Sequence, residues 1–154
     1  MIFNYVLNIP ANTPANEPVR EIYKATYGLI YRIEILFPAG CAGLAYLRVL
    51  DGGHQVYPSN QGAYFNGDNN VVAFDDTLLS LVEPFEYVLE GYNLDTLFEH
   101  NIYVRLGIAD KDIYMARFLP SITWDKLIEA LKKEKSLQQS ASSQSLQDLT
   151  NIFG

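Results

Sequence analysis

The stretch "NIYVRLGIA" at residues 101–109 alternates between aliphatic and other side chains with a period of two residues. Successive side chains of a β-strand point to opposite faces of the sheet, so this pattern predicts a strand with one buried face and one exposed face. The expected inward residues are Ile102, Val104, Leu106 and Ile108, and the outward ones include Asn101, Tyr103 and Arg105. "LIYRIEILF" at 29–37 predicts a second such strand, with Tyr31, Ile33, Ile35 and Phe37 inward and Arg32 and Glu34 outward.

Turn signals rich in Pro, Gly and Asn separate these runs, as in "PANTPANEP" at 10–18, "PAGCAG" at 38–43 and "NGDNN" at 66–70. Short strands with such punctuation and no intervening amphipathic helices indicate an all-β fold of roughly seven to nine strands. We therefore predict an antiparallel β-sandwich, or a jelly-roll-like arrangement, over residues 1–120. Residues 1–18 are a candidate N-terminal arm, and the strand order stays open.

The period changes after Pro120. "SITWDKLIEALKKEK" places Trp124, Leu127, Ile128 and Leu131 on one stripe, which predicts a C-terminal helix over 121–135. Residues 136–145 form a polar linker of mainly Gln and Ser, which we expect to be flexible. The last segment, 146–154, regains apolar residues at Leu146, Leu149, Ile152 and Phe153.

The charge of the chain bears on its partners. The formal net charge is −7, and all of this excess lies before Ser121, with 7 Lys and Arg against 14 Asp and Glu. Nucleic-acid affinity comes mostly from Lys and Arg, so we predict no nucleic-acid partner. The chain also lacks a signal-peptide pattern and any run of ~18 apolar residues, so we expect no membrane association and an origin in a cytoplasm.

Catalytic motifs are not evident. His54 and His100 stand 46 residues apart, outside any recognisable motif spacing, and Cys41 is the single cysteine. We therefore predict no enzymatic activity, no cofactor and no metal site. Oxygen-rich loops at 66–76 and 93–99 leave calcium binding open, although neither matches the EF-hand pattern.

The terminal peptide is the strongest candidate for partner binding. Four large apolar residues after a polar spacer are a solubility liability unless they are buried, so we expect Leu146, Leu149, Ile152 and Phe153 to dock. The ten-residue linker spans up to about 33 Å, which allows docking on its own domain or on another subunit. Trp124 and Leu131 would seat the helix, and outward Tyr46 and Tyr103 would complete interfaces with other protein subunits.

A second candidate is a ligand loop. Aromatic side chains next to amides are typical of carbohydrate sites, and Tyr57, Asn60, Tyr64 and Phe65 have this character. The alternative function is therefore a carbohydrate-binding β-sandwich module.

The whole pattern, an acidic β-sandwich with a candidate N-terminal arm and a tethered C-terminal peptide, resembles the small accessory structural proteins of tailed-phage and related viral particles. These are the decoration, cement and neck proteins. The resemblance implies a virion location and a homo-oligomer, or a complex with a larger shell protein, in which loops and termini bind neighbouring subunits. It rests on architecture alone and carries over no functional residues.

Overall fold

The computed structural model describes residues 1–81, 83–110, 112, 114, 126 and 129. The chain divides into two units, Met1–Lys111 and Asp112–Gly154, and the strands below belong to the first. The predicted linker and terminal peptide lie outside the described residues. So does the predicted helix apart from Lys126 and Glu129, and it stays a prediction. Among the described residues, no helix has the length and apolar character needed to span a bilayer.

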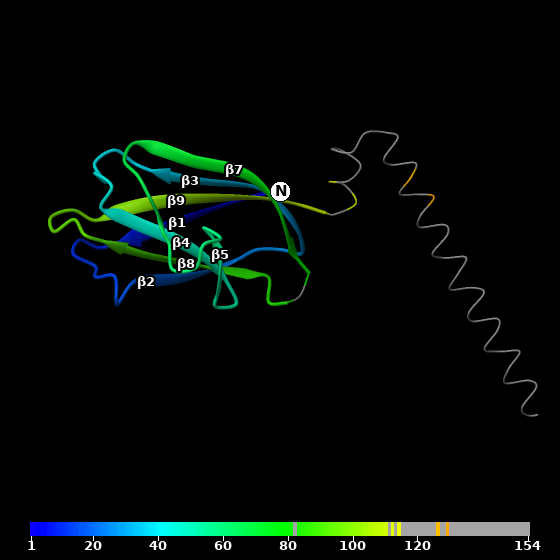
Figure 1. The fold of residues 1–154 in the computed structure, drawn as a ribbon, viewed down its shortest axis with the longest axis horizontal. Coiled ribbons are helices and arrows are strands. Elements are labelled where there is room, and N and C mark those ends of the chain that lie inside the picture. Colours follow the sequence, from blue (N-terminus) through cyan, green and yellow to red (C-terminus); the bar gives the residue numbers. More distant parts are fainter. Residues whose placement is uncertain (82, 111, 113, 115–125, 127–128, 130–154) are drawn as a thin grey trace, which may run out of the picture. The chain divides into compact units, whose positions relative to one another are not determined.

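The first unit is a sandwich of two antiparallel sheets (Figure 1). Sheet A contains, in order across the sheet, β1 (Ile2–Ile9), β9 (His100–Ala109), β3 (Gly28–Phe37) and β7 (Asn70–Ser80). Sheet B contains β2 (Val19–Lys24), β8 (Glu86–Asn93), β4 (Ala45–Asp51) and β5 (His54–Tyr57), and the short β6 (Phe65–Asn66) also pairs with β4. Residues 2–9 of the candidate N-terminal arm are thus strand β1. The all-β sandwich is as predicted.

The strand pairs are nested in the sequence. β1 pairs with β9, β2 with β8, β3 with β7, and β4 with β5, all antiparallel. The chain therefore resembles one long hairpin whose two arms are folded over together to make both sheets. This arrangement brings the loops of distant sequence segments together at the two ends of the sandwich.

Alternating aliphatic side chains of both sheets fill the core. The predicted inward residues of β9 are confirmed, since Ile102, Val104, Leu106 and Ile108 are fully buried. Ile33, Ile35 and Phe37 of β3 are also fully buried, as predicted.

The prediction for Tyr31 is wrong. A β-bulge between Ile30 and Arg32 interrupts the alternation of β3, so Ile30 is the buried residue at this level. The ring of Tyr31 lies instead against Gly107, where an added Cβ would be 2.8 Å from the ring. A bulge inserts one extra residue and so moves the side chain that follows to the other face.

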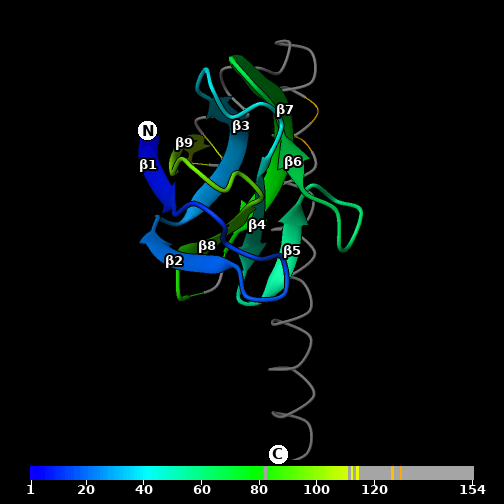
Figure 2. The ribbon, with the colours of Figure 1, turned by 90° about the vertical axis from the view of Figure 1, so that its left-hand side faces the viewer.

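Aromatic residues close both sides of the sandwich. Figure 2 shows β1 and β2 on one side and β5, β6 and β7 on the other. On the first side, the Tyr5 hydroxyl donates to the Lys24 carbonyl at 2.9 Å, and the Tyr23 hydroxyl donates to the Val6 carbonyl. On the second side, the rings of Tyr57 and Phe65 both contact Phe74. The high Tyr and Phe content therefore serves the core as well as the surface.

Candidate functional site

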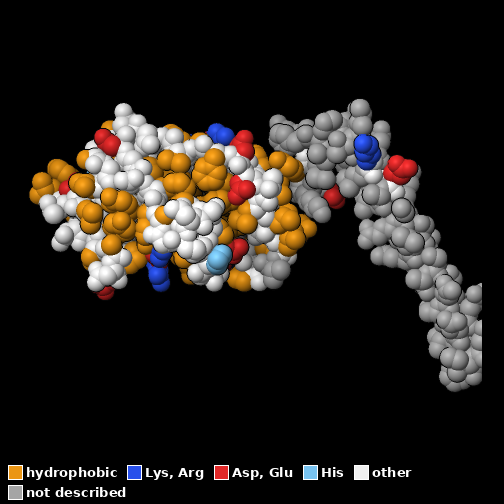
Figure 3. All heavy atoms as spheres, viewed as in Figure 1, with side chains coloured by type: hydrophobic (Ala, Val, Ile, Leu, Met, Phe, Trp, Pro, Cys, Tyr) orange, Lys and Arg blue, Asp and Glu red, His pale blue; other side chains and the backbone are white. Residues whose placement is uncertain are grey.

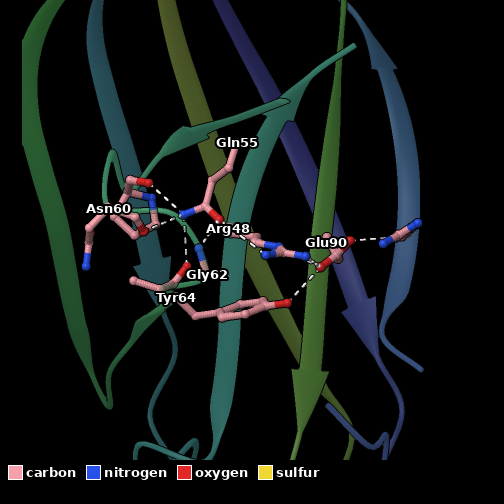
Figure 4. A network of polar contacts seen from close by, with 9 residues as sticks. Arg48, Gln55, Asn60, Gly62, Tyr64 and Glu90 are labelled. Carbon is pink, nitrogen blue, oxygen red and sulfur yellow. Dashed lines mark hydrogen bonds and ion pairs between the residues drawn. The ribbon is translucent and has the colours of Figure 1, made fainter. Parts of the chain in front are cut away.

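The loop at 58–64 is held against sheet B by one buried amide (Figure 4). Gln55 is 4% exposed, and its Nε2 lies 2.7 to 3.1 Å from the carbonyl oxygens of Pro58, Asn60 and Ala63. Its Oε1 accepts from the backbone N–H of Gly62 at 3.0 Å and from Arg48 at 3.2 Å. Because the two hydrogens of this amide are shared among three carbonyls and its oxygen accepts from Gly62, one side chain contacts four backbone groups of the loop and gives it a defined conformation.

A fully buried carboxylate on the outer face of sheet B connects this loop to three strands. Glu90 of β8 stands directly between Arg48 of β4 and Arg20 of β2 in the strand register. Arg48 Nε donates to Glu90 Oε1 at 2.6 Å, Arg20 Nε donates to Oε2 at 2.5 Å, and the Tyr64 hydroxyl donates to Oε1 at 2.7 Å. Glu90 thereby ties the loop to β2, β4 and β8.

The electrostatics of Glu90 favour its ionised form. Burial opposes ionisation, but hydrogen bonds from Tyr64, Arg48 and Arg20 outweigh it and hold the pKa of Glu90 below its usual range. Burial and the bond to Glu90 raise the pKa of Tyr64 to about 12. Both groups therefore keep one protonation state near neutral pH. Glu90 acts there as a hydrogen-bond acceptor and a counter-charge.

Three tyrosines lie beside this network and form what we call the tyrosine cluster, Tyr46, Tyr64 and Tyr92. Tyr46 and Tyr92 are cross-strand partners whose rings stack with centroids 4.4 Å apart. Tyr64 meets Tyr92 edge-on at 4.9 Å, and the Arg48 guanidinium lies 4.7 Å from the centre of the Tyr64 ring. All three side chains are half-buried, so the cluster offers aromatic surface at a fixed position for a sugar or a protein side chain.

A second feature is the loop between β8 and β9, residues 94–99, which we call the apical loop. It forms the left end of the sandwich in Figure 1, and Figure 3 shows hydrophobic side chains gathered at that end. Leu97 is 77% exposed and Phe98 is 65% exposed, next to the partly exposed Leu94 and Leu44. Such large apolar side chains are normally buried when the chain allows it.

Buried polar groups hold the apical loop in place. Asn93 is fully buried, and its Nδ2 donates to the Phe98 carbonyl at 2.9 Å. Asp95 Oδ1 accepts from the backbone N–H groups of Leu97 and Phe98, and its Oδ2 lies 3.1 Å from His100 Nε2. The backbone amide of Leu97 contributes most to holding the pKa of Asp95 below its usual range. The backbone amide of Phe98 and the His100 ring act in the same direction. These hydrogen bonds hold the loop in a conformation in which the side chains of Leu97 and Phe98 are exposed.

The two histidines occupy different settings. His100 is buried against Asp95 within this loop network. His54 is exposed and lines a groove of about 280 Å³ together with Ser59 and Asp76. Asp76 accepts instead from the Tyr57 hydroxyl at 2.8 Å and from the Thr77 amide at 2.7 Å. Within the described part of the chain, no hydrogen bond joins His54 to Ser59 or Asp76, so the groove does not hold an assembled relay.

Most acidic side chains of the oxygen-rich loops have protein partners. Asp68 accepts from the Gly40 amide at 2.8 Å, and Asp75 pairs with Arg32 at 2.9 Å. Over the residues that the structure describes, no three His, Cys, Asp or Glu side chains converge as ligands for a metal ion.

The structure places the predicted ligand-loop residues in different environments. Tyr57 is 2% exposed and belongs to the core, and Phe65 packs on Phe74 beside it. Asn60 is exposed at the tip of the loop, and Tyr64 joins the tyrosine cluster. The predicted interface residues Tyr46 and Tyr103 lie on the outer faces of sheets B and A. The others, Trp124, Leu131, Leu146, Leu149, Ile152 and Phe153, lie outside the described residues.

Sequence reasoning missed Glu90, Arg48, Arg20 and Gln55 as a unit. A signal exists in the strings "YLR" at 46–48 and "EGY" at 90–92. Paired antiparallel, they oppose Tyr to Tyr and Arg to Glu, which is the register observed. The exposed pair Leu97 and Phe98 lies in "YNLDTLFEH" at 92–100, where the oxygen-bearing side chains indicate a turn or a cation loop and the period of the apolar residues does not show which of them are exposed.

Comparisons with known proteins do not assign this chain to a family. No protein-family model matches the chain, and the search of curated proteins found no match. Among solved structures, one similar chain is the crystal structure of Aeromonas hydrophila PliG, a periplasmic lysozyme inhibitor of g-type lysozyme. It aligns with a TM-score of 0.36 and 12% identity over 71% of this chain and 85% of that chain. A similarity of this size carries no argument about function.

Proposed function

We propose that this chain is a non-enzymatic structural protein that binds neighbouring subunits of a larger assembly through its sandwich loops and its C-terminal peptide. In this proposal it is an accessory protein of a viral particle, of the decoration, cement or neck type. The observation that carries the proposal is the apical loop, which holds Leu97 and Phe98 outside the fold at 77% and 65% exposure.

The energetics of the apical loop suit a binding anchor. Burying one Leu or Phe side chain contributes about 1.5–3 kcal/mol, so the pair offers about 3–6 kcal/mol to a partner with a matching pocket. The bonds from Asn93 and to Asp95 fix the loop beforehand, which lowers the entropy lost on binding. Modest contacts of this size suffice in an array of many copies.

Charge at this end of the sandwich indicates the chemistry of the partner. The loops at 10–18, 38–44, 67–69 and 94–99 contain four acidic residues and no Lys or Arg. The acidic residues are Glu17, Asp68, Asp95 and Glu99. A partner surface with an apolar pocket and a basic rim fits this end best.

The strand order also supports the proposal. We infer that the sandwich is of the jelly-roll type, because its four nested antiparallel pairs are those of a rolled-up hairpin. Jelly rolls occur in viral capsid proteins and in lectins. Because one fold serves many functions, this likeness supports the proposal without carrying it.

Sedimentation velocity and hydrogen exchange test the proposal on the full chain, a version ending at Ser145, and Leu97→Ser/Phe98→Ser. Ile22→Ser is the matched control, because Ile22 is 63% exposed on β2. We expect the full chain to form a complex that truncation or the double change weakens at least about tenfold, with the control unchanged. Full and truncated chains that are both monomeric, with freely exchanging tail amides, would contradict the proposal.

A second candidate function, carbohydrate binding, is favoured by the tyrosine cluster, because Tyr64 of this cluster lies in the same loop as the exposed Asn60 and Gln61. Calorimetric titration with a panel of oligosaccharides tests it. Binding that persists in the version ending at Ser145 and disappears in Tyr92→Ala would support the lectin function over assembly. Tyr64→Ala is less informative, because it also removes a bond to Glu90.

A further inference from the structure

The outer face of sheet A carries an apolar row that crosses all four strands. Val6 of β1 is paired with Tyr103 of β9, Tyr103 with Leu36 of β3, and Leu36 with Val71 of β7. Val71 is 53% exposed and Val6 is 36% exposed, while Tyr103 and Leu36 are half-buried. Side chains in one cross-strand row lie next to one another, so the four form a continuous apolar strip.

Charged residues of both signs flank this strip on one side. Arg105 lies 3.4 Å from Glu34, and Arg32 lies 3.3 Å from Glu34 and 2.9 Å from Asp75. Two arginines and two acids give this face a sum of zero in a chain whose formal net charge is −7. A second copy of the chain therefore meets less electrostatic repulsion here than on the acidic surfaces.

The outer face of sheet A has a small hollow. It measures about 60 Å³ and lies between Ile2, Tyr31 and Arg105, where the ring of Tyr31 lies against Gly107. The outer face of sheet B differs, because the loop at 58–64 already covers part of it through Tyr64. Within the described residues, no such loop is pinned over the apolar row of sheet A.

We propose that the outer face of sheet A packs on the same face of a second copy in a two-fold dimer. A two-fold contact must be self-complementary, and alternating Arg and acidic residues allow each Arg to face an acid of the other copy. Four strands spaced ~4.8 Å apart and about ten residues long give a face of about 600 Å². This is most of the ~800 Å² per partner of a standard interface.

The inference rests on the proposed assembly function and names one of its contacts. The dimer places Tyr103 and Leu36 near the centre of the interface and Val71 at the edge strand β7. Large aromatic side chains at the centre of an interface contribute most of the affinity. The apical loops and the C-terminal peptides then remain available for other subunits.

Sedimentation of the full chain from about 1 to 100 µM tests the inference, a range that covers typical weak dimers. Val71→Lys adds a charge at the edge of the strip, and Ile22→Lys is its matched control, an exposed apolar position on the edge strand of sheet B. We expect Val71→Lys to raise the dimer Kd at least about tenfold and the control to leave it unchanged. Both sites are exposed, so both variants should fold.

Hydroxyl-radical footprinting at both ends of this range identifies the surface. Tyr103 and Leu36 should become protected as the concentration rises, while Tyr46 on sheet B should not. A chain that stays monomeric at 100 µM, or a dimer that Val71→Lys leaves intact, overturns the inference. Tyr103 could also be protected at all concentrations in the full chain and lose this protection in the version ending at Ser145. That result would overturn the inference too, because the chain's own C-terminal segment would then cover the face.

The inference and the proposed function fail in different ways. Truncation or Leu97→Ser/Phe98→Ser could abolish a complex that Val71→Lys does not affect. This result would contradict the dimer face and support the proposed function. A dimer lost only in Val71→Lys, with truncation and the apical changes neutral, supports the face and removes the support for the loop and the terminal peptide.

Discussion

Replacing Glu90 with Gln should destabilise the fold more than any other isosteric change on the outer faces of sheets A and B. The Glu90 side chain is fully buried, although it lies on the outer face of sheet B. Its Arg48 partner is only 20% exposed, whereas its Arg20 partner is 62% exposed. Gln keeps the shape of the side chain and can still accept from the Tyr64 hydroxyl. The change therefore removes mainly the negative charge that faces two guanidinium groups.

The magnitude follows from the burial of each partner. Removing one member of a buried ion pair costs about 3–5 kcal/mol. The exposed Arg20 contributes less than about 1 kcal/mol, because solvent screens it and can hydrate it again. Arg48 keeps its contacts with Gln55 and the Tyr64 ring, so the lower end of the range applies, about 3 kcal/mol in total. For a domain of this size, that lowers Tm by about 12 °C.

Urea denaturation followed by circular dichroism measures the free energy of unfolding of each variant. Glu90→Gln should lose about 3 kcal/mol, Arg20→Gln less than about 1 kcal/mol, and the double-mutant cycle of Glu90→Gln with Arg48→Gln should show a coupling of at least about 1 kcal/mol. A loss below about 1 kcal/mol in Glu90→Gln would refute the claim that the buried carboxylate ties the strands and loop together.

The pH dependence checks the same argument independently. The folded-state pKa of Glu90 lies below its unfolded value of about 4.3, so its ionised form stabilises the fold above that pH. This stabilisation is lost as the pH falls from about 4.3 toward the folded pKa. The difference in stability between wild type and Glu90→Gln should therefore be full at pH 7 and smaller at about pH 3. A constant difference would contradict the assignment.

Three further predictions concern packing and the apical loop. Gly91→Ala should cost about 2–3 kcal/mol, because a Cβ would lie 2.6 Å from Ile9 Cδ1 and 2.7 Å from the Tyr46 carbonyl oxygen. Gly67→Ala should cost under about 1 kcal/mol, because its Cβ meets only the exposed Asn70 side chain. Urea denaturation compares the free energies of unfolding of the two variants. Cys41 is fully buried and burial raises the pKa of its thiol, so a thiol reagent should modify it only in denaturant; rapid labelling in buffer would contradict its placement. Asp95→Ala should speed hydrogen exchange of the Leu97 and Phe98 amides at least about tenfold, and unchanged exchange would show that Asp95 does not hold the loop.

The strands were predictable because alternation is a local signal. In β9 every second residue from Ile102 to Ile108 is buried, as the pattern predicts. The same reasoning failed at Tyr31, because the β-bulge arises from the pairing of β3 with β7 and β9. The alternation of residues within one strand does not reveal such a bulge. Glu90 was missed for a related reason, since its role depends on Arg20 and Arg48, which are 70 and 42 residues away in the sequence.

The polar network on sheet B and the apolar surfaces differ in whether the chain itself satisfies them. Glu90, Arg48 and Gln55 have their partners within the fold, so changes there should alter stability first. The side chains of Leu97 and Phe98, by contrast, stay largely exposed, although Asn93 and Asp95 hold their loop in place. Serine at Leu97 and Phe98 should therefore leave the free energy of unfolding nearly unchanged and alter association alone. If these substitutions instead destabilise the monomer, the apical loop is part of the fold's own packing and the argument for a partner loses its main support.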